Sequence, residues 1–165
     1  MNVILIGMPG SGKSTVGVVL AKLLGLHFCD TDLVLQQHCG KKLQEIIRTE
    51  GDAAFIRHEV EVLAAQDVQN TVIATGGSAV YSDRAMQHLK AGGKCVYLKV
   101  AADEIERRLA NFSDRGVVIA DGMTLADLYA ARKPLYEKYA DITVSADGGT
   151  VWDTARRIAE ALRVR

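Results

Sequence analysis

Residues 7–15 read GMPGSGKST, the most informative stretch of the sequence. It matches the pattern Gly-x-x-x-x-Gly-Lys-[Ser/Thr], in which Lys13 is the lysine. The apolar, β-branched run NVILI at residues 2–6 precedes it and predicts a buried strand, and residues 14–24 follow it with the pattern of a helix. A strand, a glycine-rich loop and a helix in this order predict a phosphate-binding loop.

The chemistry of phosphate binding accounts for the residue types in this loop. Glycines let backbone N–H groups approach phosphate oxygens without interference from a Cβ atom, and the N-terminus of the following helix adds a partial positive charge. Lys13 would reach the β- and γ-phosphates, and the hydroxyl of Ser14 would bind Mg²⁺. The sequence therefore predicts a nucleoside triphosphate site formed by Gly10, Ser11, Gly12, Lys13, Ser14 and Thr15.

The composition of the 165-residue chain narrows the class of protein, and we expect one domain over residues 1–165. The 20 basic and 20 acidic residues balance, so neither nucleic acid nor a membrane surface is an expected partner. Three cysteines without metal-type spacing are typical of reduced thiols in the cytoplasm. The four histidines show no ligand constellation in the sequence and receive no role. Nothing in the sequence marks an oligomer interface, so we expect a monomer.

Strand and helix patterns alternate along the whole chain. Strands are expected at residues 2–6, 27–29, 71–75, 94–100 and 142–145. Helices are expected at residues 14–24, 33–38, 43–49, 53–68, 83–90, 102–110 and 124–139, with a last one beginning at Thr150. Residues 111–122 show no clear period and predict a lid loop. The alternation predicts an α/β protein with a five-stranded, mostly parallel sheet between two layers of helices.

Several features indicate which kind of P-loop protein this is. The guanine-reading motif Asn-Lys-x-Asp of GTPases is absent, and the third and fourth predicted strands lack the terminal acidic residue that a mechanical ATPase usually needs. Asp30 and Asp32 instead follow the second predicted strand, where α/β sheets place ligands. A lid that carries Arg115 could close over the phosphates and exclude water. These features favour a kinase for a small acceptor.

The sequence resembles the shikimate kinase family over nearly its whole length. The resemblance is carried by residues 7–15, residues 30–32 (DTD), residues 51–55 (GDAAF) with Glu59, residues 74–77 (ATGG), Arg115, and residues 132–136 (RKPLY) followed by residues 140–141 (AD). It implies a P-loop NTPase fold of the nucleoside monophosphate kinase-like type. It also implies ATP-dependent phosphorylation of the 3-hydroxyl of shikimate, a step toward chorismate and the aromatic amino acids.

For the phosphate donor, the resemblance implies that Asp30 helps to hold the Mg²⁺ together with Ser14. It also implies that Arg115 swings in with the lid toward the transferring phosphate, and that Arg107 or Arg108 lies near the adenine. Lys13, Mg²⁺ and Arg115 would together neutralise charge on the moving phosphoryl group. Asp30 also fits a simple turn or helix N-cap, and Arg115 also fits an ordinary loop charge.

For the acceptor, the resemblance implies that Asp32 accepts hydrogen bonds from hydroxyls and orients the attacking one as a base. The Gly76-Gly77 backbone would pack against the acceptor ring, and Arg132 would pair with its carboxylate. An arginine binds a carboxylate in two-pronged fashion, which a lysine does less well. From the residues alone, Arg132 also fits a solvated helix position and Gly76-Gly77 a plain turn.

The acceptor motif departs from the family pattern at two positions. Ile56 stands where the family has an arginine that grips the carboxylate, and Ser78 replaces the family's third glycine. Arg57 is the nearest candidate replacement, but one residue turns about 100° around a helix. Three interpretations therefore stay open: a shikimate kinase, a related P-loop kinase for a different small polyol or hydroxy acid, and a non-catalytic ATP-binding module.

Overall fold

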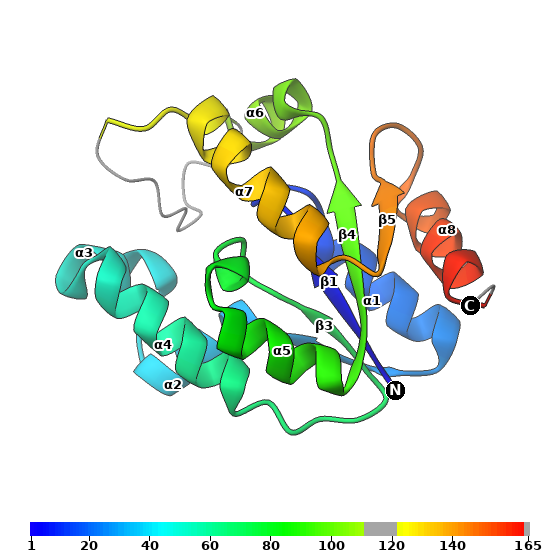
Figure 1. Cartoon of the computed structure of the whole chain (residues 1–165), viewed down its shortest axis with the longest axis horizontal. Coiled ribbons are helices and arrows are strands. Elements are labelled where there is room, and N and C mark those ends of the chain that lie inside the picture. Colours follow the sequence, from blue (N-terminus) through cyan, green and yellow to red (C-terminus); the bar gives the residue numbers. More distant parts are fainter. Residues whose placement is uncertain (111–121, 164–165) are drawn as a thin grey trace.

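The computed structural model describes residues 1–110 and 122–163 (Figure 1). The strands are β1 (Asn2–Ile6), β2 (His27–Asp30), β3 (Thr71–Ala74), β4 (Gly93–Lys99) and β5 (Ile142–Ser145). The α-helices are α1 (Lys13–Leu24), α2 (Thr31–Cys39), α3 (Leu43–Glu50), α4 (Asp52–Ala64), α5 (Asp83–Ala91), α6 (Ala102–Ala110), α7 (Leu125–Tyr139) and α8 (Val151–Arg163). Of the predicted lid, only Gly122 belongs to the described residues, and Arg115 lies outside them.

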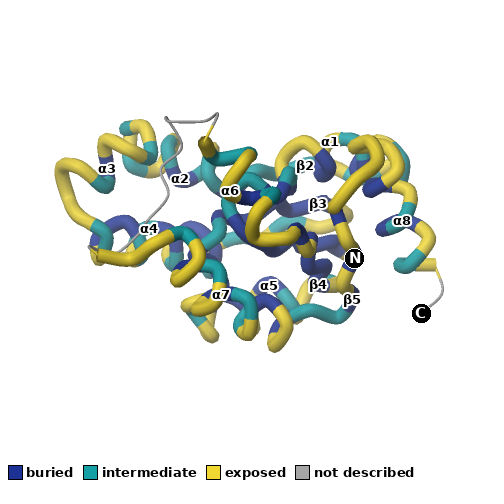
Figure 2. Tube along the Cα trace, turned by 90° about the horizontal axis from the view of Figure 1, so that it is seen from above, coloured by how far each residue is buried: buried dark blue, intermediate teal, exposed yellow. Residues whose placement is uncertain are grey.

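The five strands form one parallel sheet in the order β2-β3-β1-β4-β5, which confirms the predicted α/β fold. Strand β1 occupies the centre, where Val3 pairs with Val72 of β3 and Ile4 with Cys95 of β4. Every residue of β1 is buried, because helices cover both faces of the sheet (Figure 2). This explains why β1 reads as a nearly continuous apolar run rather than an alternating one.

Helices α1 and α8 pack on one face of the sheet, and α5 and α7 pack on the other (Figures 1 and 2). Helix α1 approaches β2 closely at Gly17, where a Cβ atom would lie 2.6 Å from Cε2 of Phe28. This contact fixes the helix that directly follows the phosphate-binding loop. The sheet and α1 therefore hold the loop from two sides.

A second, smaller apolar cluster joins α2, α3 and α4 beside the sheet. Its buried members are Leu35, Ile46, Phe55 and Val62, and Ile56 packs against it. The hydrogen bond from the backbone N–H of Leu43 to Oε1 of Gln36 (3.4 Å) also ties the start of α3 to α2. These contacts build a three-helix unit at one end of the carboxyl edge of the sheet (Figure 1).

One predicted helix ends earlier in the structure, and another contains a proline. Helix α4 ends at Ala64 rather than at residue 68, and the chain then turns into β3 through Asn70, whose φ is 51°. Helix α7 runs through Pro134 without a break. Proline removes the hydrogen bond to the carbonyl of Ala130, but Ala130 is exposed, so water can satisfy that carbonyl.

Candidate active site

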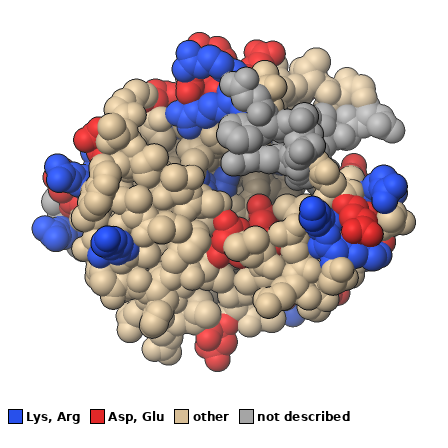
Figure 3. All heavy atoms as spheres, turned by 180° about the vertical axis from the view of Figure 1, so that it is seen from behind, with Lys and Arg blue, Asp and Glu red and all other residues tan. Residues whose placement is uncertain are grey.

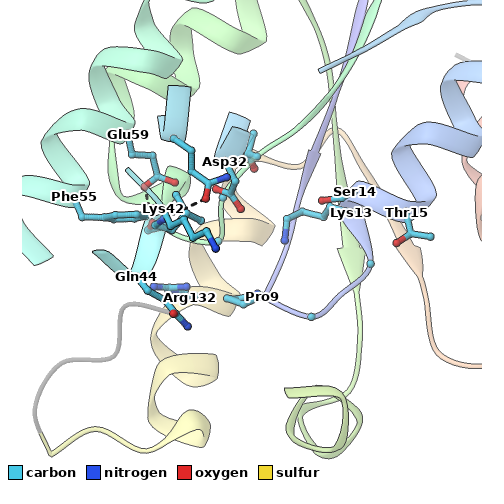
Figure 4. Close-up of a pocket in the computed structure, with 18 residues that line it drawn as sticks. Pro9, Lys13, Ser14, Thr15, Asp32, Lys42, Gln44, Phe55, Glu59 and Arg132 are labelled. Atoms are coloured by element: carbon cyan, nitrogen blue, oxygen red, sulfur yellow. Dashed lines mark hydrogen bonds between the residues drawn. The ribbon is translucent and has the colours of Figure 1, made fainter. Parts of the chain in front are cut away.

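A pocket of about 480 Å³ opens where the first three strands of the sheet end (Figure 4). The residues that line it are Pro9, Gly10, Gly12, Lys13, Ser14, Thr15, Asp32, Gln36, Lys42, Leu43, Gln44, Phe55, Glu59, Thr75, Gly76, Gly77, Ser78 and Arg132. The loop after β1 and the start of α1 form one half. Residues from α2, α3, α4, α7 and the turn after β3 form the other. The two halves face each other across one cavity, as a donor site and an acceptor site must.

The loop half contains two glycines in the left-handed conformation and a lysine that folds back onto the loop. Gly10 and Gly12 take φ values of 79° and 93°, which a side chain would strain, and Gly12 is the N-cap of α1. The ammonium of Lys13 donates to the carbonyls of Gly7 (2.8 Å) and Met8 (2.9 Å). All of the predicted nucleotide residues in this loop line the pocket except Ser11, which is buried behind it.

Arg108 supports the loop from outside the pocket. Its guanidinium donates to the carbonyls of Gly10 (3.3 Å), Ser11 (3.4 Å) and Ala146 (3.2 Å), which joins the loop to the segment after β5. Arg107 is largely exposed and pairs with Glu104. Of the two candidate arginines of α6, Arg108 is therefore the one next to the loop.

The two aspartates after β2 play different structural parts. Asp30 is the N-cap of α2, and its Oδ1 accepts a hydrogen bond from the backbone N–H of Asp32 at 3.0 Å. Asp30 is not among the residues that line the pocket, whereas Asp32 is. The alternative interpretation of Asp30 as a helix cap is thus realised. Its carboxylate and the Ser14 hydroxyl both lie at the carboxyl edge of the sheet and offer only oxygen, the donor type that Mg²⁺ prefers.

The turn after β3 leaves no room for side chains. A Cβ atom on Gly76 would collide with the carboxylates of Glu59 and Asp32, and one on Gly77 would lie 2.7 Å from Cδ of Pro9. The hydroxyl of Tyr136 donates to the carbonyl of Gly77 at 2.7 Å and fixes the turn against α7. The two glycines therefore present bare backbone to the pocket.

Arg132 is buried, with only 2% of its surface exposed, yet it lines the pocket. Its Nε donates to the hydroxyl of Tyr81 (3.3 Å), and its guanidinium lies over the ring of Tyr81 at 5.3 Å from the centroid. Burial and these contacts rule out the solvated helix position that the sequence left open. A fixed guanidinium in a pocket is suited to bind an anionic ligand group.

Glu59 is the second buried charged group of the acceptor half, 3% exposed on α4. The hydroxyl of Ser78 donates to its Oε2 at 2.5 Å, while its Oε1 finds no hydrogen-bond partner among the described residues. Burial raises the pKa of Glu59 to about 7, and the hydrogen bond from Ser78 opposes this rise. Asp32 raises that pKa further, and Arg132 and Lys13 lower it. Glu59 therefore changes charge close to neutral pH.

Arg57 is not brought to the pocket. It is exposed on α4 and absent from the lining, whereas Phe55 and Glu59, one helical turn apart, face the cavity. The rotation of about 100° per residue carries Arg57 to another face of the helix. The expectation that Arg57 replaces the arginine missing at position 56 therefore does not fit the structure.

Sequence reasoning missed several lining residues, above all Gln36, Lys42, Leu43 and Gln44. Lys42 is the N-cap of α3 and extends into the pocket from the side opposite the loop (Figure 4). No motif signals these residues, because only the packing of α3 against α2 and α4 brings them to the cavity. A lysine next to a predicted helix start was the only available signal.

Outside the pocket, charge is distributed without a dominant sign. Basic and acidic side chains are interspersed over the face shown in Figure 3. Within residues 1–110 and 122–163, no helix combines the length and the apolar character needed to cross a bilayer.

Comparisons with known proteins agree with this geometry. The sequence profile of the family described as shikimate kinase matches residues 9–163. A shikimate kinase of Chlorobium chlorochromatii is 36% identical over 98% of this chain and 92% of its own, and one of Francisella tularensis subsp. novicida is 37% identical over 98% and 94%. The solved structure of shikimate kinase from Acinetobacter baumannii in complex with shikimate superimposes with a TM-score of 0.90 at 31% identity, covering 99% of this chain and 93% of that one. The chain belongs to the shikimate kinase family.

Proposed function

We propose that this protein is a shikimate kinase, which transfers the γ-phosphoryl group of ATP to the 3-hydroxyl of shikimate. The observation that carries the proposal is the pocket in which Lys13 of the phosphate-binding loop faces Asp32 and Arg132. Membership in the family and the shikimate complex of the Acinetobacter relative support the same acceptor.

In the proposed mechanism, the loop N–H groups and Lys13 hold the phosphates of ATP. Lys13 then exchanges its contacts with the carbonyls of Gly7 and Met8 for phosphate oxygens. Ser14 and Asp30 would hold Mg²⁺, which supplies further neutralisation of phosphate charge when bound. Arg108 keeps the loop in place from behind. Arg115 would add its charge from a lid, a role that remains a prediction outside the described residues.

Asp32 would orient the acceptor hydroxyl and accept its proton, since it lines the pocket opposite the loop. The acceptor ring would lie on the bare backbone of Gly76 and Gly77, which has space for it only because both residues lack a Cβ. Positioning and charge neutralisation supply most of the catalysis in phosphoryl transfer.

The carboxylate of the acceptor would be held by Arg132 together with Lys42. Arg132 is fixed by Tyr81, and Lys42 is held at the start of α3 by the hydrogen bond between Leu43 and Gln36. Both cations line the acceptor half of the pocket, whereas Arg57 does not. Lys42 is therefore the residue best placed to supply the charge that the family's arginine supplies at position 56.

The acceptor is tested by coupled ADP release with Mg²⁺·ATP, comparing shikimate, quinate and a polyol without a carboxylate. Robust turnover with shikimate alone is the expected result. If shikimate is inert and another acceptor turns over, the fold stands and the substrate assignment falls. If ATP binds but no acceptor turns over, the protein is a non-catalytic binding module. An Asp32→Asn variant should keep ATP binding while losing turnover.

The role of Lys42 is tested by Lys42→Ala beside the matched control Lys41→Ala. Lys41 is the preceding residue and pairs with Glu50 rather than lining the pocket. Loss of a charge-assisted contact of about 1.5–3 kcal/mol should raise the KM for shikimate roughly ten- to a hundredfold in Lys42→Ala. The KM for ATP should not change. Equal effects of the two substitutions would remove Lys42 from the acceptor site.

We also propose that residues 1–165 form a single kinase domain with a lid at residues 111–122, and that the enzyme is a cytoplasmic monomer. The shared sheet and continuous main core support one domain. The balanced charge and the free cysteines fit a reducing compartment. Sedimentation of the purified enzyme would test the monomer.

A further inference from the structure

Two histidines that carry no recognisable motif in the sequence meet on the outer side of the three-helix unit. His38 lies in the last turn of α2, and His58 lies in α4, one turn before Glu61. The Nε2 atom of His38 and the Nδ1 atom of His58 lie 3.8 Å and 3.9 Å from the same oxygen, Oε2 of Glu61. The two imidazole rings meet edge to face with centroids 6.0 Å apart.

The hydrogen bonding of His58 leaves one nitrogen oriented toward Glu61. Its Nε2 lies 3.0 Å from Oε2 of Glu50, which favours a proton on Nε2. The Nδ1 atom is buried and finds no hydrogen-bond partner among the described residues. In the neutral ring, this nitrogen presents a lone pair toward a carboxylate oxygen 3.9 Å away. Two electron-rich atoms that face each other in this way are stabilised by a cation between them.

The arrangement has the features of a transition-metal site. A histidine that binds a metal through one nitrogen usually donates its other N–H to a carboxylate, and the 3.0 Å contact between Nε2 of His58 and Glu50 allows this. Two imidazoles and one carboxylate form a common three-ligand set for zinc, with a fourth position left for water. The three ligand atoms lie within 4.8 Å of one another, and ligands of a tetrahedral zinc lie about 3.3 Å apart. Small rotations of these side chains would close that difference.

We propose that His38, His58 and Glu61 bind a divalent transition metal of the zinc class, which links α2 to α4. Nitrogen ligands favour zinc, cobalt or nickel over the Mg²⁺ that accompanies ATP, so the two sites select different metals. Helix α2 also carries Asp32 and Gln36 to the pocket, and helix α4 carries Phe55 and Glu59. The metal would therefore brace the acceptor half of the pocket from outside.

The test is titration of the full chain, without an affinity tag and freed of metal by a chelator, with Zn²⁺ in the presence of excess Mg²⁺. Calorimetry should show one bound zinc whose affinity falls at least about tenfold in His38→Ala, His58→Ala and Glu61→Gln. Glu50→Gln should weaken binding roughly ten- to a hundredfold, because it removes the acceptor that orients His58. The melting temperature of the parent protein should rise with Zn²⁺, and that of His58→Ala should not.

His88→Ala is the matched control, since His88 lies on α5 and its Nε2 contacts the carbonyl of Gln66 instead. It should bind zinc as the parent protein does. Cobalt supplies an independent readout, because a tetrahedral site with nitrogen ligands gives strong visible absorption without requiring a folding measurement. Zinc binding that persists in His38→Ala and His58→Ala, or that is lost only in Cys39→Ser, would overturn the proposal.

Discussion

Replacing Glu59 with glutamine should change how the stability of this protein depends on pH. Glu59 is 3% exposed, and burial raises its pKa from 4.5 to about 7 in the folded chain. In the unfolded chain the carboxyl is hydrated and titrates near its ordinary value. The folded state therefore holds one more proton than the unfolded state between about pH 4.5 and pH 7.

The magnitude follows from that difference in bound protons. Where the folded state binds the extra proton, the free energy of unfolding falls by about 1.4 kcal/mol for each unit of pH increase. Integrated from pH 4.5 to about pH 7, the loss is about 3 kcal/mol, and the curve is flat above that range. The stability that Glu59 contributes in its protonated form is thus fully present below pH 4.5 and is lost as the pH rises through the folded pKa. Glutamine cannot ionise and should remove this slope.

Urea unfolding at several pH values between 4.5 and 8 would measure the effect. Between pH 4.5 and pH 8, the free energy of unfolding of Glu59→Gln should rise by about 3 kcal/mol relative to that of the parent protein. This change does not depend on how stable the variant is at pH 4.5. Glu106→Gln, on the exposed side of α6, is the control and should run parallel to the parent. Carboxyls with a lowered pKa, such as Asp141, also make stability depend on pH. Their effect is the same in all three proteins, so it cancels when the curves are compared. Parallel curves for Glu59→Gln and the parent would refute the buried, protonated carboxyl.

Three further predictions concern the elements that hold the site. Tyr136→Phe removes the hydrogen bond to the Gly77 carbonyl (2.7 Å) and should cost about 1–3 kcal/mol in urea unfolding, whereas an unchanged midpoint would show that the bond contributes little. Gly17→Ala drives a Cβ atom into the ring of Phe28 and should destabilise by about 1–3 kcal/mol in thermal melting; a rise in melting temperature would contradict this packing. Lys13→Ala should lower kcat about 10²–10³-fold in the ADP-release assay, and near-normal turnover would remove Lys13 from the transition state.

The donor half of the pocket could be predicted from the sequence because it is local. A strand, the loop with Lys13 and the start of α1 are consecutive in the chain, so glycine positions and hydrophobic pattern define the site together. The parallel sheet could be predicted for the same reason, since each strand and helix has its own pattern. The capping role of Asp30 was among the alternatives that the residue type alone allowed.

The acceptor half depends on tertiary packing and could be predicted only in part. Arg132 and the Gly76-Gly77 turn were reached through the family resemblance, because an arginine in a helix gives no sign of its burial. Lys42 lies beside Glu59 in the pocket only because the apolar cluster packs α3 against α2 and α4. The meeting of His38 with a residue of α4 depends on the same helix packing and has no counterpart in sequence spacing.

The two departures from the family pattern have separate physical consequences. Ile56 packs against the apolar cluster of the three-helix unit, so this isoleucine supports the helices rather than the ligand. Ser78 donates the short hydrogen bond to Glu59, and a glycine there would remove this donor from a carboxyl whose other oxygen already lacks one among the described residues. Replacing Ile56 with arginine would therefore remove an apolar contact of the cluster and leave the Ser78–Glu59 pair unchanged. On the proposed function, the acceptor half is an alternative arrangement, in which Arg132 and Lys42 would carry the positive charge and Ser78 donates to one oxygen of Glu59.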